Sequence, residues 1–560
     1  MKSRRSAPAP RRALSLGASR DPLLPFLLNP QSYPHRPRWV RLIQTHASFV
    51  FIAPPYVYKV KKPVDFGFLN FATLERRRHF CEREVALNRR LSPGIYLGVV
   101  PISQRGGRLA FGRDGRIVDY AVHMRRLSER HFLDRLVARG EVVPGDLDRL
   151  VAVLRRFYEA QEPTAAIEAW GRIDRLRIST DENFRQVRPF LGVPAAPARP
   201  DRPPATLSRP ALEAIRLYTN RFYARHRGLF VARIREGRIR DCHGDLHLEH
   251  IHVTPRALHV YDCIEFNDRL RYVDVASDAA FLAMDLDHEG RPDLARQFAA
   301  HMAAALRDDG MLALMDFYKC YRAFVRGKVE SLHGVTPAAP DGERAASADR
   351  ARRYFRLALG YAVAGSRPTA LVVMGRIASG KSTLARALGA ELGCEVVSSD
   401  CLRKQMAGYP LYERTSAAAR RRLYSKAMTR RTYEALLAAA EARLRAGQHV
   451  VLDATFARRA QRDQLGRRLG ALGFPWRLIE AHAGDAAVRR RLRARERSAE
   501  EVSDARLEDF NALTRLYEPP LEVPRHRRVR VATAGPMTRA VIRALHGLAR
   551  LQVEEPCPSL

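Results

Sequence analysis

The apolar positions in the N-terminal half follow the periods of short strands and amphipathic helices. Residues 49–60, FVFIAPPYVYKV, predict two strands around a Pro-Pro turn, and residues 75–91, ERRRHFCEREVALNRRL, predict one amphipathic helix. From 141 to 235 the pattern is mostly helical, interrupted by a proline-rich loop. Two short apolar runs follow, at 251–254 and 258–266, and we expect helices from there to about residue 330.

The pattern changes in the C-terminal third. Residues 331–350 are polar and rich in Pro, Ala and Gly, without periodicity, which is typical of an interdomain linker. Beyond them, apolar runs of strand length alternate with helical stretches, and this alternation predicts an open parallel α/β sheet. The expected strands are residues 370–374, 394–400, 449–455, 476–483 and 528–534.

Length and composition favour a soluble protein of more than one domain. A chain of 560 residues exceeds what a single hydrophobic core sustains. Its 46% hydrophobic and 28% charged residues are ordinary for globular protein, and no stretch approaches the roughly 20 apolar residues of a membrane helix. The 7 cysteines are odd in number, scattered and free of C-x-x-C pairs, which argues against a disulfide framework and a zinc ribbon. We therefore expect a cytoplasmic protein.

The net charge of +37 leaves two interpretations open. Such a charge is typical of proteins that bind nucleic acid or another polyanion. The arginines are, however, spread over the whole chain, which favours a solvated surface together with sites for phosphorylated small molecules. Only nine of the 97 basic residues are lysines, and Lys59, Lys61, Lys62 and Lys381 fall at two candidate sites. Lysine supplies a compact charge on a slim stem, which arginine cannot replace there.

The first of these sites is the sequence GRIASGKST, which matches the phosphate-binding pattern G-x-x-x-x-G-K-[ST] in full. It follows an expected strand and precedes an expected helix, as the pattern requires. Its glycines let backbone amides surround a phosphate, Lys381 bridges the outer phosphates and Ser382 reaches Mg²⁺. The expected ATP-binding residues are Gly375, Arg376, Ile377, Ala378, Ser379, Gly380, Lys381, Ser382 and Thr383.

Two carboxylates lie at the ends of expected strands, where ligands bind in sheets of this class. We assign Asp400 to orienting and deprotonating an acceptor hydroxyl, and Asp453 to holding the water shell of the metal ion. The alternative is that both cap helices at strand-to-helix turns. Arg403 follows Asp400 by one helical turn and is a candidate substrate contact.

Residues 488–510 form an arginine-rich segment with two possible roles. Arginines on a mobile lid, such as Arg491 and Arg495, would offset charge on a transferring phosphoryl group. A solvated charged helix face is the alternative.

The phosphate loop, the S-D-x-x-R of residues 399–403, the D-A-T of residues 453–455 and the arginine-rich lid resemble the small P-loop kinases, which include polynucleotide kinase, gluconate kinase and zeta toxins. The resemblance covers about residues 367–540. It implies phosphoryl transfer from ATP to a hydroxyl and does not name the acceptor.

The second site resembles the aminoglycoside phosphotransferases, which share the protein-kinase fold. HGDLHLEHIHV at 243–253 is similar to their catalytic loop, and VYDCIEF at 260–266 to their metal-binding strand. The resemblance implies that Asp245 orients the substrate hydroxyl and Asp262 holds Mg²⁺. It also implies that Lys59 binds ATP with Glu84 as its ion-pair partner, and that Asp274 and Asp278 support the catalytic loop.

The second site also departs from that family's pattern. His250 stands where the family has a metal-binding Asn, and a neutral imidazole is a poorer Mg²⁺ ligand than an amide oxygen. No glycine-rich loop precedes Lys59, and Lys61 is an alternative phosphate lysine. Two further hypotheses concern the histidines, which either form a transition-metal cluster or have structural roles: His243, His247, His250 and His252.

The whole chain resembles bacterial two-domain proteins with an aminoglycoside phosphotransferase-like half and a P-loop kinase, or AAA-type, half. The predicted fold is α/β and α+β multidomain: a protein-kinase-like N-domain and a P-loop NTPase C-domain with a parallel sheet. The predicted parts are a disordered basic tail (1–22, alternatively a targeting peptide), the kinase-fold domain (23–330), a linker with a connecting helix (331–366), the P-loop domain (367–540) and a C-terminal tail (541–560).

The functional hypothesis is an ATP- and Mg²⁺-dependent kinase acting on a small-molecule hydroxyl through the C-terminal site, with no membrane partner. Two alternatives stay open. One is a 5′-hydroxyl nucleic-acid kinase, and the other is a P-loop enzyme regulated by an inactive N-terminal kinase-like module.

Overall fold

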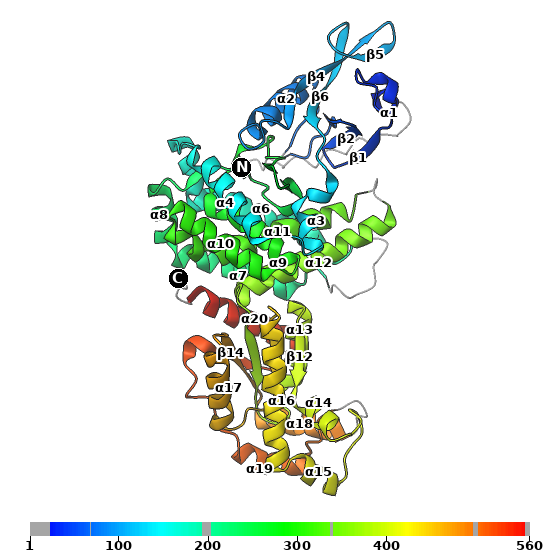
Figure 1. Ribbon diagram of the computed structural model, residues 1–560. Helices are drawn as coiled ribbons and strands as arrows, with labels where there is room; N and C mark the ends of the chain where they lie inside the picture. The colour runs from blue at the N-terminus through cyan, green and yellow to red at the C-terminus, as the bar shows by residue number, and fades with distance from the viewer. Residues whose placement is uncertain (1–22, 68, 193–202, 337–339, 497–501, 555–560) are drawn as a thin grey trace, which may run out of the picture. The chain divides into compact units, whose positions relative to one another are not determined.

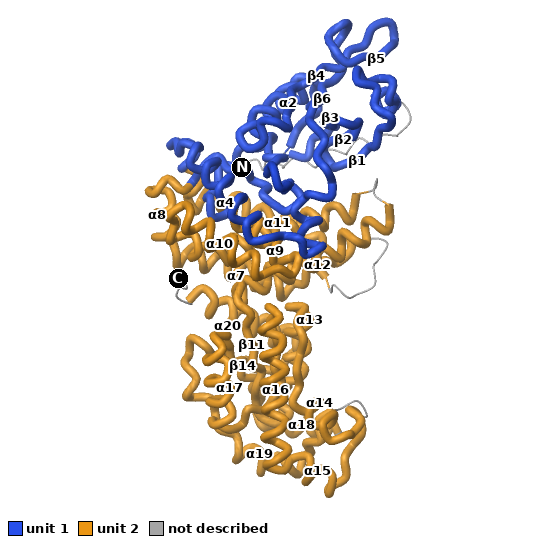
Figure 2. The backbone as a smooth tube through the Cα atoms, viewed as in Figure 1, with its two compact units in different colours: residues 1–168, 239–278 blue, residues 169–238, 279–560 orange. Residues whose placement is uncertain are grey.

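The computed structural model describes residues 23–67, 69–192, 203–336, 340–496 and 502–554 (Figure 1). The tail expected at residues 1–22 lies outside these residues, as do positions 497–501 of the expected lid. By its internal contacts the chain forms two compact units (Figure 2). Unit 1 contains residues 1–168 and 239–278, and unit 2 contains residues 169–238 and 279–560.

The elements of unit 1 are mainly strands. They are α1 (Leu23–Leu28), β1 (Arg41–Gln44), β2 (Ser48–Ala53), β3 (Tyr56–Lys61), α2 (Leu74–Asn88), β4 (Tyr96–Arg105), β5 (Arg108–Phe111), β6 (Arg116–Arg125), α3 (Leu133–Ala138), α4 (Pro144–Glu159), α5 (Ala165–Glu168), β7 (Ile239–Asp241), β8 (Ile251–Val253), β9 (Leu258–Val260) and β10 (Tyr272–Asp274).

A six-stranded antiparallel sheet in the order β1-β2-β3-β6-β4-β5 dominates unit 1. The two strands predicted around the Pro-Pro turn are β2 and β3, which pair in antiparallel register, and the predicted helix is α2. Thr73 caps α2, because its side chain accepts a hydrogen bond from Arg76 N at 3.2 Å. One face of α2 is buried through Cys81, which packs with Tyr96 and Val122 of the sheet. This packing sets the position of Glu84, one turn further along α2.

Unit 2 combines helices with a parallel sheet. It contains α6 (Ile173–Gln186), α7 (Arg209–Arg225), α8 (Arg227–Arg235), most of α9 (Val275–His288), α10 (Pro292–Leu306), α11 (Asp309–His333), α12 (Asp341–Val363), β11 (Ala370–Met374), α13 (Lys381–Leu392), β12 (Glu395–Ser398), α14 (Ser399–Met406), α15 (Ala417–Leu423), α16 (Lys426–Arg445), β13 (Val450–Asp453), α17 (Arg459–Ala471), β14 (Trp476–His482), α18 (Asp485–Glu496), α19 (Phe510–Arg515), β15 (Arg528–Ala532) and α20 (Met537–Glu554).

The five strands expected after residue 366 are β11 to β15, and the prediction of a parallel sheet is confirmed. The order is β12-β13-β11-β14-β15, and all four neighbouring pairs are parallel. Ala370, Val372 and Met374 share a buried core with α16 and α17. Because side chains alternate along a strand, Leu371 and Val373 point to the opposite face. Every residue of β11 is buried, as expected for the central strand of a sheet covered on both faces.

The last helix corrects the tail expected from residue 541. The structure continues as α20 to Glu554, with Val541, Leu545 and Leu548 almost fully buried. Arg477 of β14, itself 2% exposed, donates a hydrogen bond to Leu548 O at 3.4 Å and another to Gln552 at 2.5 Å. The helix is part of the core because its apolar positions recur with helical spacing.

The polar stretch expected as a linker is also more ordered than its composition indicates. The helix α11 runs on to His333, and α12 starts at Asp341 and buries Ser347 and Ala348. The predicted domain boundary between residues 330 and 367 falls inside unit 2, because α11 and α12 pack along each other and α12 contacts α20.

No helix in the described ranges combines the length and the apolar character that crossing a bilayer requires.

Ending the chain after residue 536 removes α20 and should leave unit 2 unable to fold. Each of the large apolar side chains that α20 buries contributes about 1.5–3 kcal/mol, so the sum is comparable with the whole stability of a domain. Ending the chain after Glu554 is the matched control, expected to have the wild-type melting temperature. A 536-residue chain that is soluble and melts like the control would contradict the assignment of α20 to the core.

Candidate active sites

The phosphate loop lies between β11 and α13, and two of its glycines are required by the backbone. Gly375 has φ +153°, and a Cβ there would lie 2.3 Å from Ala481 O and 2.6 Å from Ser379 Oγ. Gly380 has φ +87°, a left-handed conformation that side chains disfavour. The loop ends at the first turn of α13, so its amides and the helix dipole face the same point. This geometry is suited to an anion such as a nucleotide phosphate.

Asp453 is placed beside the phosphate loop by the sheet register. It ends β13 opposite Val373 of β11 and Ser398 of β12. Its side chain is 4% exposed, and burial raises its pKa, although the charge of Lys381 and the hydroxyl of Ser382 counter the rise. Asp453 Oδ1 is buried and has no hydrogen-bond partner among the described residues. A buried carboxylate oxygen next to the Mg²⁺-binding serine of the pattern fits a metal ion and its water shell.

Asp400 lies at the same edge of the sheet. It follows Ser398, the partner of Asp453, by two residues and sits in the first turn of α14. The N-cap residue of α14 is Ser398, so Asp400 does not cap this helix. Its negative charge contributes to the raised pKa of Asp453, which shows that the two carboxylates are close enough to interact.

Arg403 does not line this edge as expected. Its side chain is 5% exposed, and Nη1 donates hydrogen bonds to Leu423 O at 2.8 Å and Thr429 Oγ1 at 3.2 Å. The guanidinium also lies 4.6 Å from the ring centre of Tyr424. These contacts join α14 to the end of α15, to Tyr424 and to the first turn of α16, so Arg403 stabilises the fold of this region.

The lid arginines differ from each other. Arg491 Nη1 donates to Ala378 O at 3.2 Å and to Thr533 Oγ1 at 3.4 Å, so this side chain lies against the phosphate loop. Burial and the neighbouring arginines lower its pKa. Arg495 lies one turn further along α18, half-buried, and its carbonyl oxygen accepts a hydrogen bond from Arg414. Arg376 of the loop turns away, to Ala483 O at 2.9 Å and Asp485 at 2.8 Å.

Thr533 is a residue of this site that the sequence analysis missed. It is fully buried just after β15, and its hydroxyl donates to Ser379 O at 2.5 Å. Thr533 also accepts a hydrogen bond from Arg491 of α18, so it joins the phosphate loop to this helix. The signal in the sequence, a threonine after the last strand, is too common to identify such a contact.

In unit 1, Lys59, Glu84 and Asp262 form one ion-paired cluster. Lys59 Nζ lies 2.9 Å from Glu84 Oε1 and 2.6 Å from Asp262 Oδ1. Burial alone would lower the pKa of Lys59, but the three nearby carboxylates raise it well above its ordinary value. Burial would raise the pKa of Asp262, and Lys59 and His250 lower it. Both groups are therefore charged near neutral pH.

The two candidate phosphate lysines have different surroundings. Both project from one face of β3, two residues apart. The side chain of Lys61 is fully buried, where it pairs with Glu84 Oε2 at 2.7 Å and with Glu265. The side chain of Lys59 is 14% exposed. Lys59 is therefore the lysine that a ligand can reach. Lys61 fixes the position of Glu84 through a fully buried ion pair. Glu265 was missed because it lies in an irregular segment.

Asp278 supports the loop that carries Asp245. It is fully buried and accepts hydrogen bonds from His243 N at 3.0 Å, Gly244 N at 2.9 Å and Tyr158 Oη at 2.9 Å. Asp274 instead accepts from Ala276 N at 2.8 Å, at the start of α9. Asp278 thus holds the loop directly through its backbone amides.

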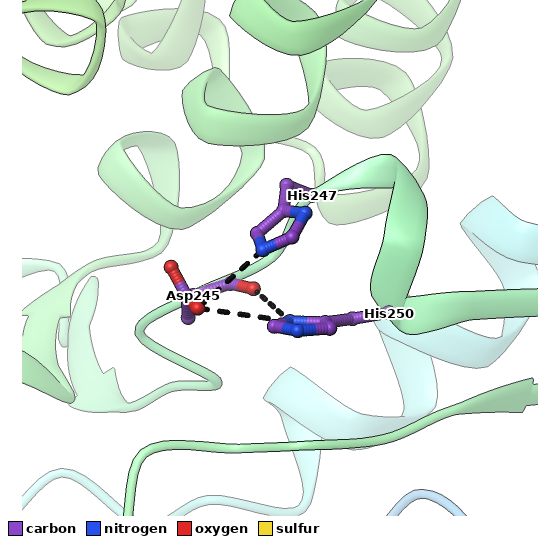
Figure 3. Close-up of side chains that lie close together, drawn as sticks. All are labelled: Asp245, His247 and His250. Atoms are coloured by element: carbon purple, nitrogen blue, oxygen red, sulfur yellow. Dashed lines mark hydrogen bonds and ion pairs between the residues drawn. The ribbon is translucent and has the colours of Figure 1, made fainter. Parts of the chain in front are cut away.

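The four histidines separate into structural and clustered ones. His243 is buried, donates through Nε2 to Tyr261 O at 2.9 Å and accepts through Nδ1 from Asp245 N at 3.3 Å, so both ring nitrogens are engaged. His252 packs with Phe132, at 5.3 Å between ring centres. The rings of His247 and His250 are tilted by 39° with their centres 3.9 Å apart, and both lie around Asp245 (Figure 3). The hypothesis of a four-histidine metal cluster is therefore wrong for His243 and His252.

Comparison with known proteins found a matching family model, curated relatives and similar solved structures. A family model described as an AAA domain matches residues 371–520. The uncharacterized protein Rv2004c of Mycobacterium tuberculosis is 33% identical over 428 residues, which cover 76% of this chain and 80% of that protein. The uncharacterized protein Mb2027c of Mycobacterium bovis matches to the same extent.

Parts of the chain are also similar to solved structures. A gluconokinase from Sinorhizobium meliloti 1021 is 25% identical, covering 33% of this chain and 93% of that chain with a TM-score of 0.24. A choline/ethanolamine kinase family protein from Mesorhizobium loti is 12% identical, covering 60% of this chain and 98% of that chain with a TM-score of 0.33.

The variant Asp453→Asn should be more stable than the wild type at neutral pH. A carboxyl group whose pKa is raised by folding lowers the stability of the folded state as the pH rises above the pKa of the unfolded state, and the loss is complete above the folded pKa. Below the pKa of the unfolded state this loss disappears. We expect a gain of about 1 kcal/mol at pH 7, since a buried carboxylate with one oxygen lacking a hydrogen bond costs more than a neutral amide. The gain should shrink near pH 4.

Denaturant midpoints at the two pH values measure this difference. Asp463→Asn, in an exposed ion pair on α17, is the matched control, expected to show no gain. If Asp453→Asn is less stable than the wild type at pH 7, the carboxylate is a structural group and its assignment to metal binding fails.

Proposed function

We propose that this chain, which belongs to the same family as the Mycobacterium tuberculosis protein Rv2004c, is an ATP-dependent phosphotransferase. Its C-terminal site would transfer the γ-phosphate of ATP to a hydroxyl of a small molecule. The observation that carries the proposal is the meeting of the phosphate loop, Lys381 and two strand-end carboxylates at one edge of the parallel sheet.

Each group at this edge has a defined task in the proposal. The loop amides and Lys381 bind the outer phosphates and orient them. Ser382 and Asp453 would hold Mg²⁺, which when bound neutralises charge on the phosphates. Asp400 accepts the proton of the acceptor hydroxyl as the new O–P bond forms and the bond between the γ-phosphorus and the bridging oxygen breaks. Arg491 lies beside the loop, where its charge favours the same phosphates.

A second phosphotransferase site in unit 1 is favoured by a specific observation. Lys59 is paired with Glu84 and faces Asp262, while Asp278 supports the loop of Asp245. In this second proposal Lys59 binds ATP phosphates, Asp262 holds the metal ion and Asp245 orients a hydroxyl. A regulatory module that binds nucleotide without transferring phosphate would use the same contacts.

A small molecule is the acceptor that we favour over a nucleic acid. The burial of Arg403 argues against a contact between this side chain and the end of a nucleic acid. The spread of arginines over the whole sequence weakens the argument for nucleic acid from net charge. We place the activity in the cytoplasm, because the cysteines among the described residues are all free.

Transfer of labelled γ-phosphate from ATP into a panel of metabolites and oligonucleotides tests the proposal. Wild type, Lys381→Ala and Asp245→Asn are compared, with Lys426→Ala, an exposed lysine at the start of α16, as the matched control. We expect Lys381→Ala to lose at least about 100-fold in rate, because it removes a charge that stabilises the transferring group. The control should match the wild type.

The labelled fraction identifies the acceptor class. Full activity in Lys381→Ala with loss only in Asp245→Asn would move the chemistry to unit 1 and overturn the proposal. Labelling of oligonucleotides alone would favour the nucleic-acid kinase.

A further inference from the structure

The orientation of His250 defines which of its ring nitrogens carries a proton. Nδ1 lies 2.9 Å from Asp245 O. A carbonyl oxygen only accepts hydrogen bonds, so Nδ1 carries the hydrogen of this bond. In the neutral ring the other nitrogen, Nε2, then has no hydrogen and presents a lone pair. This is the arrangement seen in metal-binding histidines, whose second nitrogen donates to a carbonyl or carboxylate.

The lone pair of His250 Nε2 faces a carboxylate oxygen. Asp262 Oδ2 lies 3.5 Å from Nε2, while the other oxygen, Oδ1, is bound by Lys59. Two electron-rich atoms at this distance repel unless a cation lies between them. Metal bonds to imidazole nitrogen and carboxylate oxygen are about 2.0–2.2 Å long, and a 3.5 Å separation corresponds to an angle of about 110° at the ion, close to tetrahedral.

The backbone of Asp262 supports this placement. Asp262 has φ +64°, a left-handed conformation uncommon for residues with a side chain. Tyr96 Oη accepts a hydrogen bond from Asp262 N at 3.1 Å, and Asn88 Oδ1 accepts one from Cys263 N at 2.8 Å. The strained turn is thus fixed on both sides of the carboxylate, as is common where a residue positions a ligand.

Two further possible ligands lie around His250. The side chains of Asp245, His247 and His250 each offer a ligand atom, and these atoms lie within 4.8 Å of one another (Figure 3). Asp245 Oδ2 is 3.5 Å from His247 Nε2. The set combines imidazole nitrogens with carboxylate oxygens. Such a set favours first-row transition ions, whereas Mg²⁺ prefers oxygen ligands alone.

We propose that unit 1 binds a first-row transition-metal ion, of the class of Mn²⁺, Co²⁺ or Zn²⁺, between His250 Nε2 and Asp262 Oδ2. Asp245 and His247, which lie around His250, supply further side chains of metal-ligating type beside this position. The site selects these ions over Mg²⁺ because an imidazole occupies a ligand position. The inference concerns metal binding alone and does not depend on phosphate transfer by either unit.

The test measures metal binding by the full-length protein without nucleotide. Metal-free protein is dialysed against Co²⁺, and the bound ion is quantified by elemental analysis and by its visible absorption. Mn²⁺ bound in parallel is examined by pulsed electron paramagnetic resonance, which detects a directly bound imidazole nitrogen. All samples carry Asp453→Asn, which removes the carboxylate proposed to hold a metal ion at the C-terminal site.

The variant His250→Asn removes the nitrogen ligand and keeps a neutral side chain that still offers an oxygen. His259→Asn, on the neighbouring strand β9, is the matched control. We expect His250→Asn to weaken Co²⁺ binding on the order of 100-fold and to abolish the nitrogen signal of bound Mn²⁺. The His259→Asn variant should bind both ions as its parent does.

Equal Co²⁺ affinity in His250→Asn and its parent would overturn the inference, as would a parent protein that binds Mg²⁺ as tightly as Co²⁺. Circular dichroism of each variant shows whether it is folded. If His250→Asn is unfolded, His250→Gln replaces it in the same comparison, with the same two results deciding.

Discussion

A carboxylate removed from water needs a cation close to it, and the sites in both units are built around this constraint. In unit 1 two lysines share Glu84, and one of them also holds Asp262. In unit 2 Asp453 is buried beside Lys381, with one oxygen that no described residue binds. The first cluster is largely neutralised by its own lysines. The second keeps a carboxylate oxygen whose charge a bound metal ion would balance.

The two units provide for phosphate in different ways. In unit 2 backbone amides would bind phosphate, because the loop that leads into the N-terminus of α13 has glycine at two positions, Gly375 and Gly380, whose conformation or surroundings disfavour a side chain. The central strand β11 then places this loop between β13 and β14, so every strand-end group faces it. In the proposal for unit 1 a side chain, Lys59, would bind phosphate, and the position of its partner Glu84 depends on α2 packing against the antiparallel sheet. A loss of packing would therefore affect the site in unit 1 more than the loop in unit 2.

Local features were predictable from the sequence and long-range contacts were not. The phosphate loop, the five parallel strands and the β2–β3 hairpin each depend on neighbouring residues, so their patterns were sufficient. The burial of Arg403 depends on the path of the chain twenty residues later, and the role of Glu265 depends on a lysine more than two hundred residues earlier. The sequence alone predicts a tail in place of α20, because the apolar face of this helix is buried only by its contacts with α7, α12 and β15. The spacing of residues along the chain does not indicate which distant residues will contact one another.

The most direct test of the central claim is the affinity of the full-length protein for a non-hydrolysable ATP analogue with Mg²⁺, measured by titration calorimetry before and after Lys381→Ala. The account predicts that the tightest class of binding disappears in Lys381→Ala and persists in Lys59→Ala, because the loop of unit 2 is the main nucleotide site. Unchanged tight binding in Lys381→Ala, together with its loss in Lys59→Ala, would contradict the account and make unit 1 the principal nucleotide-binding part of the chain.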